Sequence, residues 1–377
     1  MAEHERTDVL IVGAGQSGLA AGYHLRKRGI SVRILEADAR VGDVWRRRYD
    51  SLLLYSPARY CALPGMPMPL PGHVFPTGRQ MGDYLESYAR RFDLPVATGV
   101  HVDRAEAPKA DGGSWTVTAG DRRFEAQALI VATGEFTHPR VPAFATDLDP
   151  AIRQVHSSEY RNPGQLAPGA TLVVGLSHSG ADIAHELADH GPVIVSGKAR
   201  GEFPFSIDGR GGRIGWRIWK QVAWHVLTLD TPVGRKVGPQ LRHGGGPLIR
   251  WKTRDLRRAG VELAESRTVG VREGRPVLDD GRVLDVANVV WCTGFRRDDS
   301  WIVPAIEQRD GWPVERRGVS TTPGLYFLGL VFQYAFTSML VVGAGRDAAY
   351  VADHVQGWLR QGATRPLPSA TGSLAAR

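Results

Sequence analysis

The chain has 377 residues, a length that allows two α/β domains with a sizeable buried core. Hydrophobic residues make up 42% of it and glycines number 45, a composition typical of a turn-rich globular enzyme and not of a disordered or coiled-coil protein. The formal charge is +8, but the basic residues are spread along the chain. We therefore expect solvated arginines and small anionic ligands rather than nucleic acid as a partner.

The two cysteines, Cys61 and Cys292, lie far apart and form no CxxC motif. The sequence therefore predicts neither a redox-active dithiol nor a metal site, and it favours a reducing, cytoplasmic location. Residues 1–8 are polar and lead directly into a strand, so we expect no signal peptide. Charged residues interrupt the apolar stretch 214–229, which excludes it as a transmembrane helix.

A succession of strand, glycine-rich turn, helix and strand occurs twice, which predicts parallel sheets with right-handed crossovers. Gly29 ends the first predicted helix and Gly191 ends the second. The predicted elements are strand 9–12, a helix to about residue 28 and strand 32–35, then strand 171–174, a helix to about residue 190 and strand 193–195.

Between and after these units the pattern predicts further elements. Thr77 and Gln80 form a capping-box pattern at the start of a helix over 75–92. The others are two strands of an antiparallel ribbon at 101–107 and 114–118, buried strands at 128–132 and 286–291, a strand at 325–330, and a helix from about 338 to 359.

The fold class predicted from this order is α/β, with two Rossmann-like dinucleotide-binding domains, the second inserted into the first. The first domain is expected to comprise 1–165 and 286–360, and the second 166–285. The tail 361–377 is expected to be disordered.

The first glycine turn, Gly13-Ala-Gly15-Gln16-Ser17-Gly18, follows a strand and opens a helix. In this motif the first glycine makes the tight turn, the second lets a pyrophosphate approach the backbone, and the third allows the helix to pack on the strand. Glu36, at the end of the next strand, can accept hydrogen bonds from adenosine ribose hydroxyls. The alternative is a purely structural turn, but strand, helix and acid are all in register.

The second turn, Gly175-Leu-Ser177-His178-Ser179-Gly180, has serine in place of the middle glycine. The next strand ends with Ser196, Lys198 and Arg200 and has no acidic residue. Because a 2′-phosphate is attracted by cations and repelled by a carboxylate, this end of the sheet favours NADPH over NADH. The alternative is a decayed nucleotide site that is kept for its fold.

Two nucleotide sites without a dithiol indicate FAD together with NADPH, with hydride passing to the flavin and electrons then to another acceptor. At this point the chain resembles the class B (single-component) flavin-dependent monooxygenases, nearest the bacterial CzcO-like flavoproteins and the plant YUCCA-type enzymes. The resemblance covers roughly residues 7 to 358. It is carried, in chain order, by Gly42-Asp-Val44-Trp45, Tyr49-Asp-Ser-Leu52, Ser56-Pro-Ala-Arg59, Phe75-Pro-Thr77, Ala132-Thr133-Gly134, His156-Ser-Ser-Glu-Tyr160 and Gly329-Leu-Val-Phe-Gln333.

The resemblance implies a mechanism in which NADPH reduces FAD, O2 adds at the flavin C4a position, and the resulting (hydro)peroxide passes one oxygen to a small organic substrate. It implies Tyr55 and Gln333 as catalytic residues. Beyond the two turns and their strand ends, it implies cofactor contacts by Ala37, Gly42, Val44, Trp45, Leu54, Ser56, Val102, Ala132, Thr133, Gly134, Thr293, Gly294, Ser338 and Leu340. The helix start near Ser338 would stabilise reduced anionic flavin by its dipole.

The chain departs from the family pattern at several positions. Pro150 and Ile152 replace two fingerprint residues, Tyr55 stands where an asparagine near the flavin is expected, and His178 replaces a frequent asparagine. Together with Ser177, these departures bear on coupling and NADP+ retention more than on FAD binding.

The stretch 214–229 carries Trp216, Trp219 and Trp224 among basic residues. Core packing is the preferred interpretation, and the alternatives are the lid of an apolar substrate tunnel or peripheral contact with a membrane. His156 is expected to be a packed linker histidine, and the segment 343–345 to pack closely against the first domain.

Three functional hypotheses remain: an oxygenating enzyme, which we favour; an NADPH-dependent flavoprotein reductase or oxidase without oxygen transfer; and a flavoprotein associated with membrane transport. The sequence specifies neither the substrate nor the oligomeric state, because pocket walls come from loops without a portable pattern.

Overall fold

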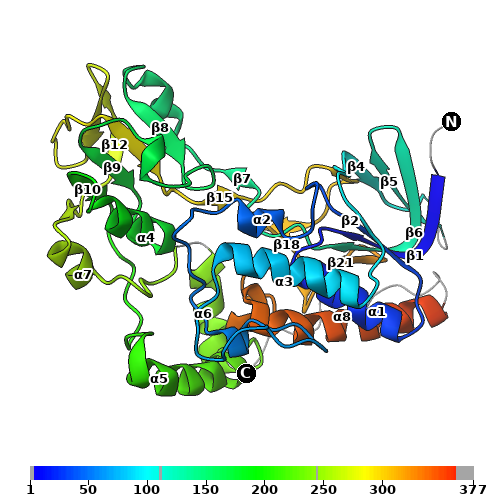
Figure 1. The fold of residues 1–377 in the computed structure, drawn as a ribbon. Coiled ribbons are helices and arrows are strands. Elements are labelled where there is room, and N and C mark those ends of the chain that lie inside the picture. The colour runs from blue at the N-terminus through cyan, green and yellow to red at the C-terminus, as the bar shows by residue number, and fades with distance from the viewer. Residues whose placement is uncertain (1–3, 110–112, 243–244, 362–377) are drawn as a thin grey trace.

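Two sheets of mainly parallel strands organise the computed structural model, which describes residues 4–109, 113–242 and 245–361. They lie side by side, with the second unit at the left of Figure 1. The predicted tail falls almost wholly on residues 362–377, which lie outside the described residues.

The first sheet is built around β1, whose last four residues are all buried. The parallel order β3-β2-β1-β6 continues on the far edge of β6, where β5 pairs antiparallel with its first half and β21 parallel with its second half. The strands are β1 (His4–Val12), β2 (Val32–Leu35), β3 (Val96–Ala97), β4 (Arg104–Glu106), β5 (Trp115–Ala119), β6 (Arg122–Val131), β16 (Ile302–Val303), β19 (Glu315–Arg316), β20 (Val319–Ser320) and β21 (Leu325–Phe327).

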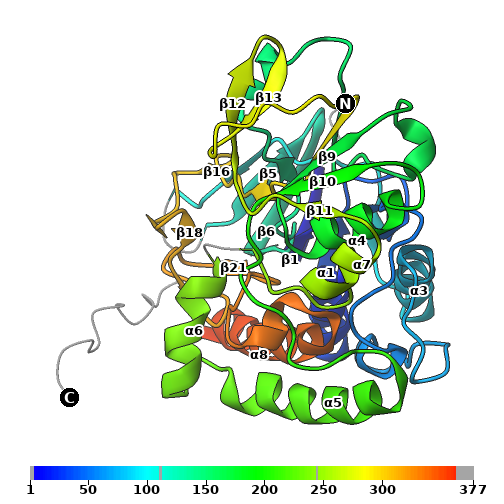
Figure 2. The same ribbon diagram turned by 90° about the vertical axis from the view of Figure 1, so that its left-hand side faces the viewer.

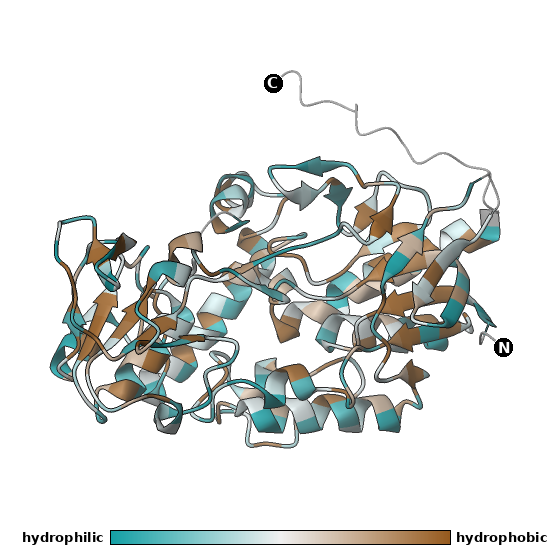
Figure 3. Cartoon of the chain, turned by 90° about the horizontal axis from the view of Figure 1, so that it is seen from above, coloured by the Kyte–Doolittle hydropathy of each residue, from teal (hydrophilic) through white to brown (hydrophobic). Residues whose placement is uncertain are grey.

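Both faces of this sheet are covered, which explains its nearly continuous apolar strands (Figure 3). The helices α1 (Gln16–Lys27), α3 (Gly78–Arg91) and α8 (Val341–Gln361) pack on one face, and the β4–β5 ribbon packs on the other. The capping box at the start of α3 is confirmed: Thr77 Oγ1 accepts from the Gln80 backbone N–H, and the Gln80 side chain accepts from the Thr77 N–H. The antiparallel ribbon is confirmed as well.

The second sheet has the parallel order β11-β10-β9-β14-β8. Helices α4 (His178–Leu187) and α7 (Thr253–Arg258) lie at one face and the hairpin β12–β13 at the other. The strands are β8 (Arg153–His156), β9 (Thr171–Val174), β10 (Val193–Ser196), β11 (Glu262–Leu263), β12 (Thr268–Arg272), β13 (Arg275–Leu278) and β14 (Asn288–Trp291).

The expected domain boundaries need a correction. Strands β8 and β14 were placed in the first domain, but both pair in the second sheet, so that sheet extends beyond 166–285 at both ends. The physical reason is that a parallel strand pairs far along the chain, which leaves no local signal. The chain passes between the two sheets through two short strands, β7 (His138–Pro139) and β15 (Phe295–Arg296), which pair antiparallel with each other.

A helical excursion leaves the second sheet after β10 and packs beneath the first unit (Figures 1 and 2). It comprises α5 (Gly209–Gln221), a π-helical turn at Val222–Val226, and α6 (Pro232–Arg242). Backbone hydrogen bonds join it to the C-terminal part of the chain: Leu229 N–H donates to the carbonyl of Tyr334, and Phe336 N–H to that of Leu227. Residues that follow β10 of the second sheet thus pack against the first unit near the start of α8.

The remaining short elements connect these layers. They are α2 (Asp43–Arg46), β17 (Gln308–Arg309), β18 (Trp312–Pro313), and short 3-10 turns at Ala58–Tyr60, Ala143–Asp147, Pro163–Gln165 and Phe336–Met339. The last of these turns precedes α8, so the helix predicted from about residue 338 begins regularly at Val341.

Candidate cofactor sites and the contact between them

The first glycine turn has the geometry that its motif predicts. Gly13 has φ +104°, and a Cβ there would collide with the backbone carbonyl of Ala132. A Cβ at Gly18 would collide with the carbonyl of Gly13, so α1 approaches the turn as closely as the backbone allows. These two positions therefore require glycine for folding.

Gly15 is different because nothing lies within 4 Å of the position of its missing Cβ, and its φ of −73° suits any residue. Folding therefore does not require glycine here, whereas a dinucleotide pyrophosphate over the start of α1 does. This open cradle at a helix N-terminus is the feature of the structure that fits FAD.

Glu36 lies at the edge of the same cradle. Its carboxylate accepts hydrogen bonds from the Ala14 N–H at 2.7 Å and the Asp38 N–H at 3.0 Å, and burial raises its pKa. A carboxylate has further acceptor sites, so Glu36 is positioned to receive ribose hydroxyls. Arg47 in turn holds Asp38 through two bonds of 2.6 and 2.8 Å, which orders the loop after β2.

The second turn repeats the first in its backbone contacts. Gly175 has φ +107° and faces the carbonyl of Cys292, as Gly13 faces that of Ala132, and a Cβ at Gly180 would collide with the carbonyl of Gly175. The Gly175 N–H donates to Ser196 at 2.9 Å, as the Gly13 N–H donates to Leu35 at 2.7 Å. The structure thus contains two dinucleotide folds of the same construction.

This equivalence shows what replaces the ribose-binding acid in the second unit. Val12 pairs with Leu35 and Val174 pairs with Ser196, so Gly197 occupies the position that corresponds to Glu36. The exposed side chains of Lys198 and Arg200 follow it. No carboxylate stands at this strand end, and Ser196 Oγ is hydrogen-bonded to Thr268 Oγ1 at 2.7 Å.

A glycine segment from the 245–247 loop covers part of the second turn. Ser177 Oγ donates to the carbonyl of Gly246 at 3.0 Å, and a Cβ at Gly246 would crowd the His178 ring. His178 is half-buried there, and the loss of solvent around its ring lowers its pKa to about 4. The middle position of this turn is therefore a neutral, polar and tightly packed surface rather than the open one at Gly15.

A buried hydrogen-bond cluster joins the two units. Tyr49 and Tyr55, from the first unit, donate to the same carboxylate oxygen of Asp182 on α4, at 2.8 and 2.7 Å. Burial raises the pKa of Asp182, although the two hydroxyls oppose the shift, and burial raises the pKa of Tyr55 well above its ordinary value. The Tyr55 ring also lies 5.0 Å from that of His178.

Sequence reasoning found Tyr55 but missed Asp182. In the sequence, Asp182 stands among the apolar residues of 181–184, on the face of α4 that packs against the second sheet. A buried carboxylate needs hydrogen-bond donors, so this position predicts a partner but not its identity. The structure places the hydroxyl of Tyr55 toward the second glycine turn, and its role near the flavin stays a prediction.

Arg250 forms a second link between the units. It donates to the carbonyl of Leu54 at 3.1 Å, and its guanidinium lies 4.8 Å from the centroid of the Phe75 ring. Trp45 also belongs to both units, since it packs against the helical core of the first and the α4 core of the second. The residues expected along the flavin therefore lie at the junction between the sheets.

The other predicted cofactor contacts fall into two groups. The first surrounds the turns and the crossings: Ala37, Gly42, Val44, Val102, Thr133, Gly134, Ser179, Thr293 and Gly294 lie on loops at strand ends or at the start of a helix. Gly42 has φ +88° and a backbone contact with Gly82 that permits no side chain. Their contacts with a cofactor stay predictions.

The second group lies at the start of α8. Ser338 Oγ accepts from the backbone N–H groups of Tyr334 and Ala335 at 3.1 Å, which closes the turn before the helix. Gln333 is fully buried, with its amide bonded to the Leu330 N–H at 3.3 Å and the Phe327 carbonyl at 3.1 Å. Gln333 therefore shapes this loop, and a direct catalytic role for it stays a prediction.

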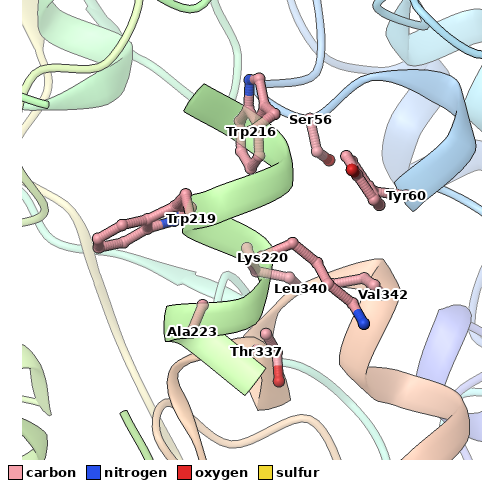
Figure 4. Close-up of a pocket in the computed structure, with 9 residues that line it drawn as sticks. All are labelled: Ser56, Tyr60, Trp216, Trp219, Lys220, Ala223, Thr337, Leu340 and Val342. Atoms are coloured by element: carbon pink, nitrogen blue, oxygen red, sulfur yellow. The ribbon is translucent and has the colours of Figure 1, made fainter. Parts of the chain in front are cut away.

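A narrow pocket lies between α5 and this loop (Figure 4). Trp216, Trp219 and Tyr60 supply the aromatic part of its lining, with Ser56 beside Tyr60, and Leu340 completes it. Trp216 is only 6% exposed and packs with Phe203, which confirms core packing as its main role, while its position also makes it a wall of the pocket. His156 is likewise a packed residue, bonded to Ser158 and to the Gly294 carbonyl.

Comparison with known proteins gives the family. Residues 10–201 match the pyridine nucleotide-disulphide oxidoreductases. The chain is 37% identical over 350 residues to an uncharacterized CzcO-like oxidoreductase of Geobacillus kaustophilus, with 92% of this chain and 98% of the relative covered. It belongs to this family of oxidoreductases.

Two further relatives agree. The indole-3-pyruvate monooxygenase YUCCA1 of Oryza sativa is 31% identical, with 92% of this chain and 90% of the relative covered. The solved flavin-containing monooxygenase from Stenotrophomonas maltophilia is 26% identical with a TM-score of 0.73, and covers 94% of this chain and 99% of its own. The chain belongs to the class B flavin monooxygenases. The resemblance inferred from the motifs is thus confirmed, and this family member is an oxidoreductase with FAD and NADPH as its cofactors.

Proposed function

We propose that this flavin monooxygenase uses NADPH to activate O2 and transfers one oxygen atom to a small apolar organic substrate. The main support is the paired construction of the two glycine turns, with Tyr55 of the first unit hydrogen-bonded to Asp182 of the second. FAD would be held by the first turn and Glu36, and NADPH by the second turn. When bound, the flavin supplies the electron transfer and the oxygen chemistry, while the protein positions both cofactors.

The thiols support oxygen, rather than a disulfide, as the electron acceptor. The two cysteines lie far apart in the sequence. Burial raises the pKa of Cys61 to about 11 and that of Cys292 to about 12. At neutral pH both are protonated, and a protonated thiol is a poor nucleophile. The chain therefore offers no pair of reactive thiols for exchange with a disulfide.

The aromatic pocket supports an apolar substrate. Trp216, Trp219 and Tyr60 line this pocket together with Ser56 and Leu340, both of which are predicted to lie along the flavin (Figure 4). By its name, the related YUCCA1 acts on indole-3-pyruvate, a planar aromatic molecule. The pocket is too narrow in this structure to hold a molecule of that size, so its walls support only the apolar, aromatic part of such a substrate.

The oxygen reaction is tested by reducing the FAD-loaded protein with NADPH without air and mixing it with oxygen. We expect a transient flavin absorbance distinct from both the oxidised and the reduced forms. Direct reoxidation with stoichiometric hydrogen peroxide would instead identify an NADPH oxidase and exclude oxygen transfer.

The preference for NADPH is expected to depend on Lys198 and Arg200. Replacing both with alanine should raise the KM for NADPH about tenfold or more and leave that for NADH unchanged, because one charge-assisted hydrogen bond to a phosphate contributes about 1.5 kcal/mol. Initial rates of flavin reduction with each nucleotide measure this. The exposed pair Arg272→Ala/Arg275→Ala on the β12–β13 hairpin serves as control, and an equal loss with both nucleotides would refute the 2′-phosphate assignment.

A further inference from the structure

Helix α5 has two faces of different character. Its inner face carries Gly212 and Trp216, which are buried against the aromatic cluster of Phe203. Its outer face carries Ile214 and Ile218, and each of these side chains is 62% exposed. In Figure 2 α5 lies along the lower border of the molecule as its outermost layer.

Cations accompany the two isoleucines on the outer face. Arg210 and Arg217 follow helical spacing beside them and are exposed, while the exposed Arg213 lies on the flank of α5, where it lines a pocket together with Trp216. Asp230 is the sole acidic residue in the sequence from 209 to 242, a segment that contains seven lysines and arginines. Asp230 accepts from the Tyr334 hydroxyl at 2.8 Å, and Asp208, just before α5, is paired with Arg250. Within the described ranges Asp230 is therefore engaged away from Arg210 and Arg217, whereas Asp208 lines the same pocket as Arg213.

Charge decides what could cover this face. The C-terminal residues 362–377 include two arginines and no acidic residue, so they would be repelled by it. Two copies of the chain would likewise bring cations against cations. An anionic lipid surface, by contrast, attracts the arginines and accepts exposed isoleucine side chains at the boundary of its acyl region.

We propose that the outer face of α5 docks the protein on anionic membranes, with the helix lying in the plane of the interface. No helix within the described residues is long and apolar enough to cross a bilayer, so the contact would be peripheral. The exposed isoleucines, and not the buried Trp216, are the side chains that would enter the lipid. This docking is independent of the proposed oxygen reaction.

The test uses the full-length, FAD-loaded protein and sedimentation with vesicles of phosphatidylcholine containing roughly one third phosphatidylglycerol. We expect binding at low salt that is lost at high salt and in pure phosphatidylcholine. The variant Arg210→Gln/Arg217→Gln should bind about 25-fold more weakly, since each cation near an anionic surface contributes about fivefold. The variant Ile214→Ser/Ile218→Ser should also bind more weakly.

The control is Val269→Ser/Arg272→Gln on the hairpin at the far side of the second sheet, where Val269 is 52% exposed beside an exposed arginine. It should bind like the wild type, and all variants should keep their FAD. Wild-type protein that fails to sediment with anionic vesicles would overturn the proposal. So would equal binding to neutral vesicles, or an equal loss in the control.

Discussion

Replacing Gly15 with alanine is expected to weaken FAD binding about a hundredfold or more while leaving the apoprotein as stable as the wild type. Nothing surrounds the position of the new methyl group, and the backbone of Gly15 lies in a region that alanine adopts freely. We therefore expect the free energy of unfolding to change by no more than about 0.5 kcal/mol. The methyl group would instead enter the space of the pyrophosphate, where losing charge-assisted hydrogen bonds costs about 3 kcal/mol.

Two other glycines provide the controls. Gly13→Ala combines φ +104° with a collision against the Ala132 carbonyl, so it should lower stability by about 2–4 kcal/mol even without FAD. Gly357→Ala on α8 also meets open space but lies away from the turn, so it should leave FAD affinity unchanged and raise stability by about 0.5–1 kcal/mol, because alanine is the better helix former. Urea unfolding of the apoproteins and titration with FAD measure the two effects. Normal FAD affinity in Gly15→Ala would show that the pyrophosphate lies elsewhere.

The glycine turns could be predicted from the sequence because their chemistry is local. Gly13, Gly15, Gly18 and Glu36 lie within one strand–helix–strand unit, so their spacing alone fixes their relative positions. The second unit was predicted for the same reason, including the missing acid at the end of β10. Local sequence patterns were therefore sufficient to predict both glycine turns.

The junction between the units could not be predicted in the same way. Tyr55 and Asp182 are 127 residues apart, and their contact arises only when two separately built sheets pack together. The stretch 214–229 shows another limit: the helix begins earlier, at Gly209, and changes to π-helical geometry at Val222, so a single helical period does not assign its faces. The membrane alternative was consequently attached to the tryptophans, whereas the outward side chains are isoleucines.

The contact of Asp182 with Tyr49 and Tyr55 leads to a second prediction with a large effect, namely strong non-additivity. Tyr49→Phe or Tyr55→Phe alone should lower the free energy of unfolding by about 1 kcal/mol, because the other hydroxyl still donates to the carboxylate. The double variant should lose about 3–5 kcal/mol, since a buried carboxylate is then left without these donors. Adding Asp182→Leu should restore most of the loss, because no buried charge remains.

The stability loss of the double variant should depend on pH. Burial raises the pKa of Asp182 in the folded protein, so the folded state holds its proton to higher pH than the unfolded state does. The carboxyl group therefore costs stability as pH rises through the folded pKa, and losing both hydroxyl donors raises that pKa further. The penalty of the double variant, measured by urea unfolding across the acidic and neutral range, should shrink on acidification. Additive losses that do not vary with pH would mean that the two tyrosines do not hold an ionised Asp182, and the junction between the two units would then rest on Arg250 and on packing.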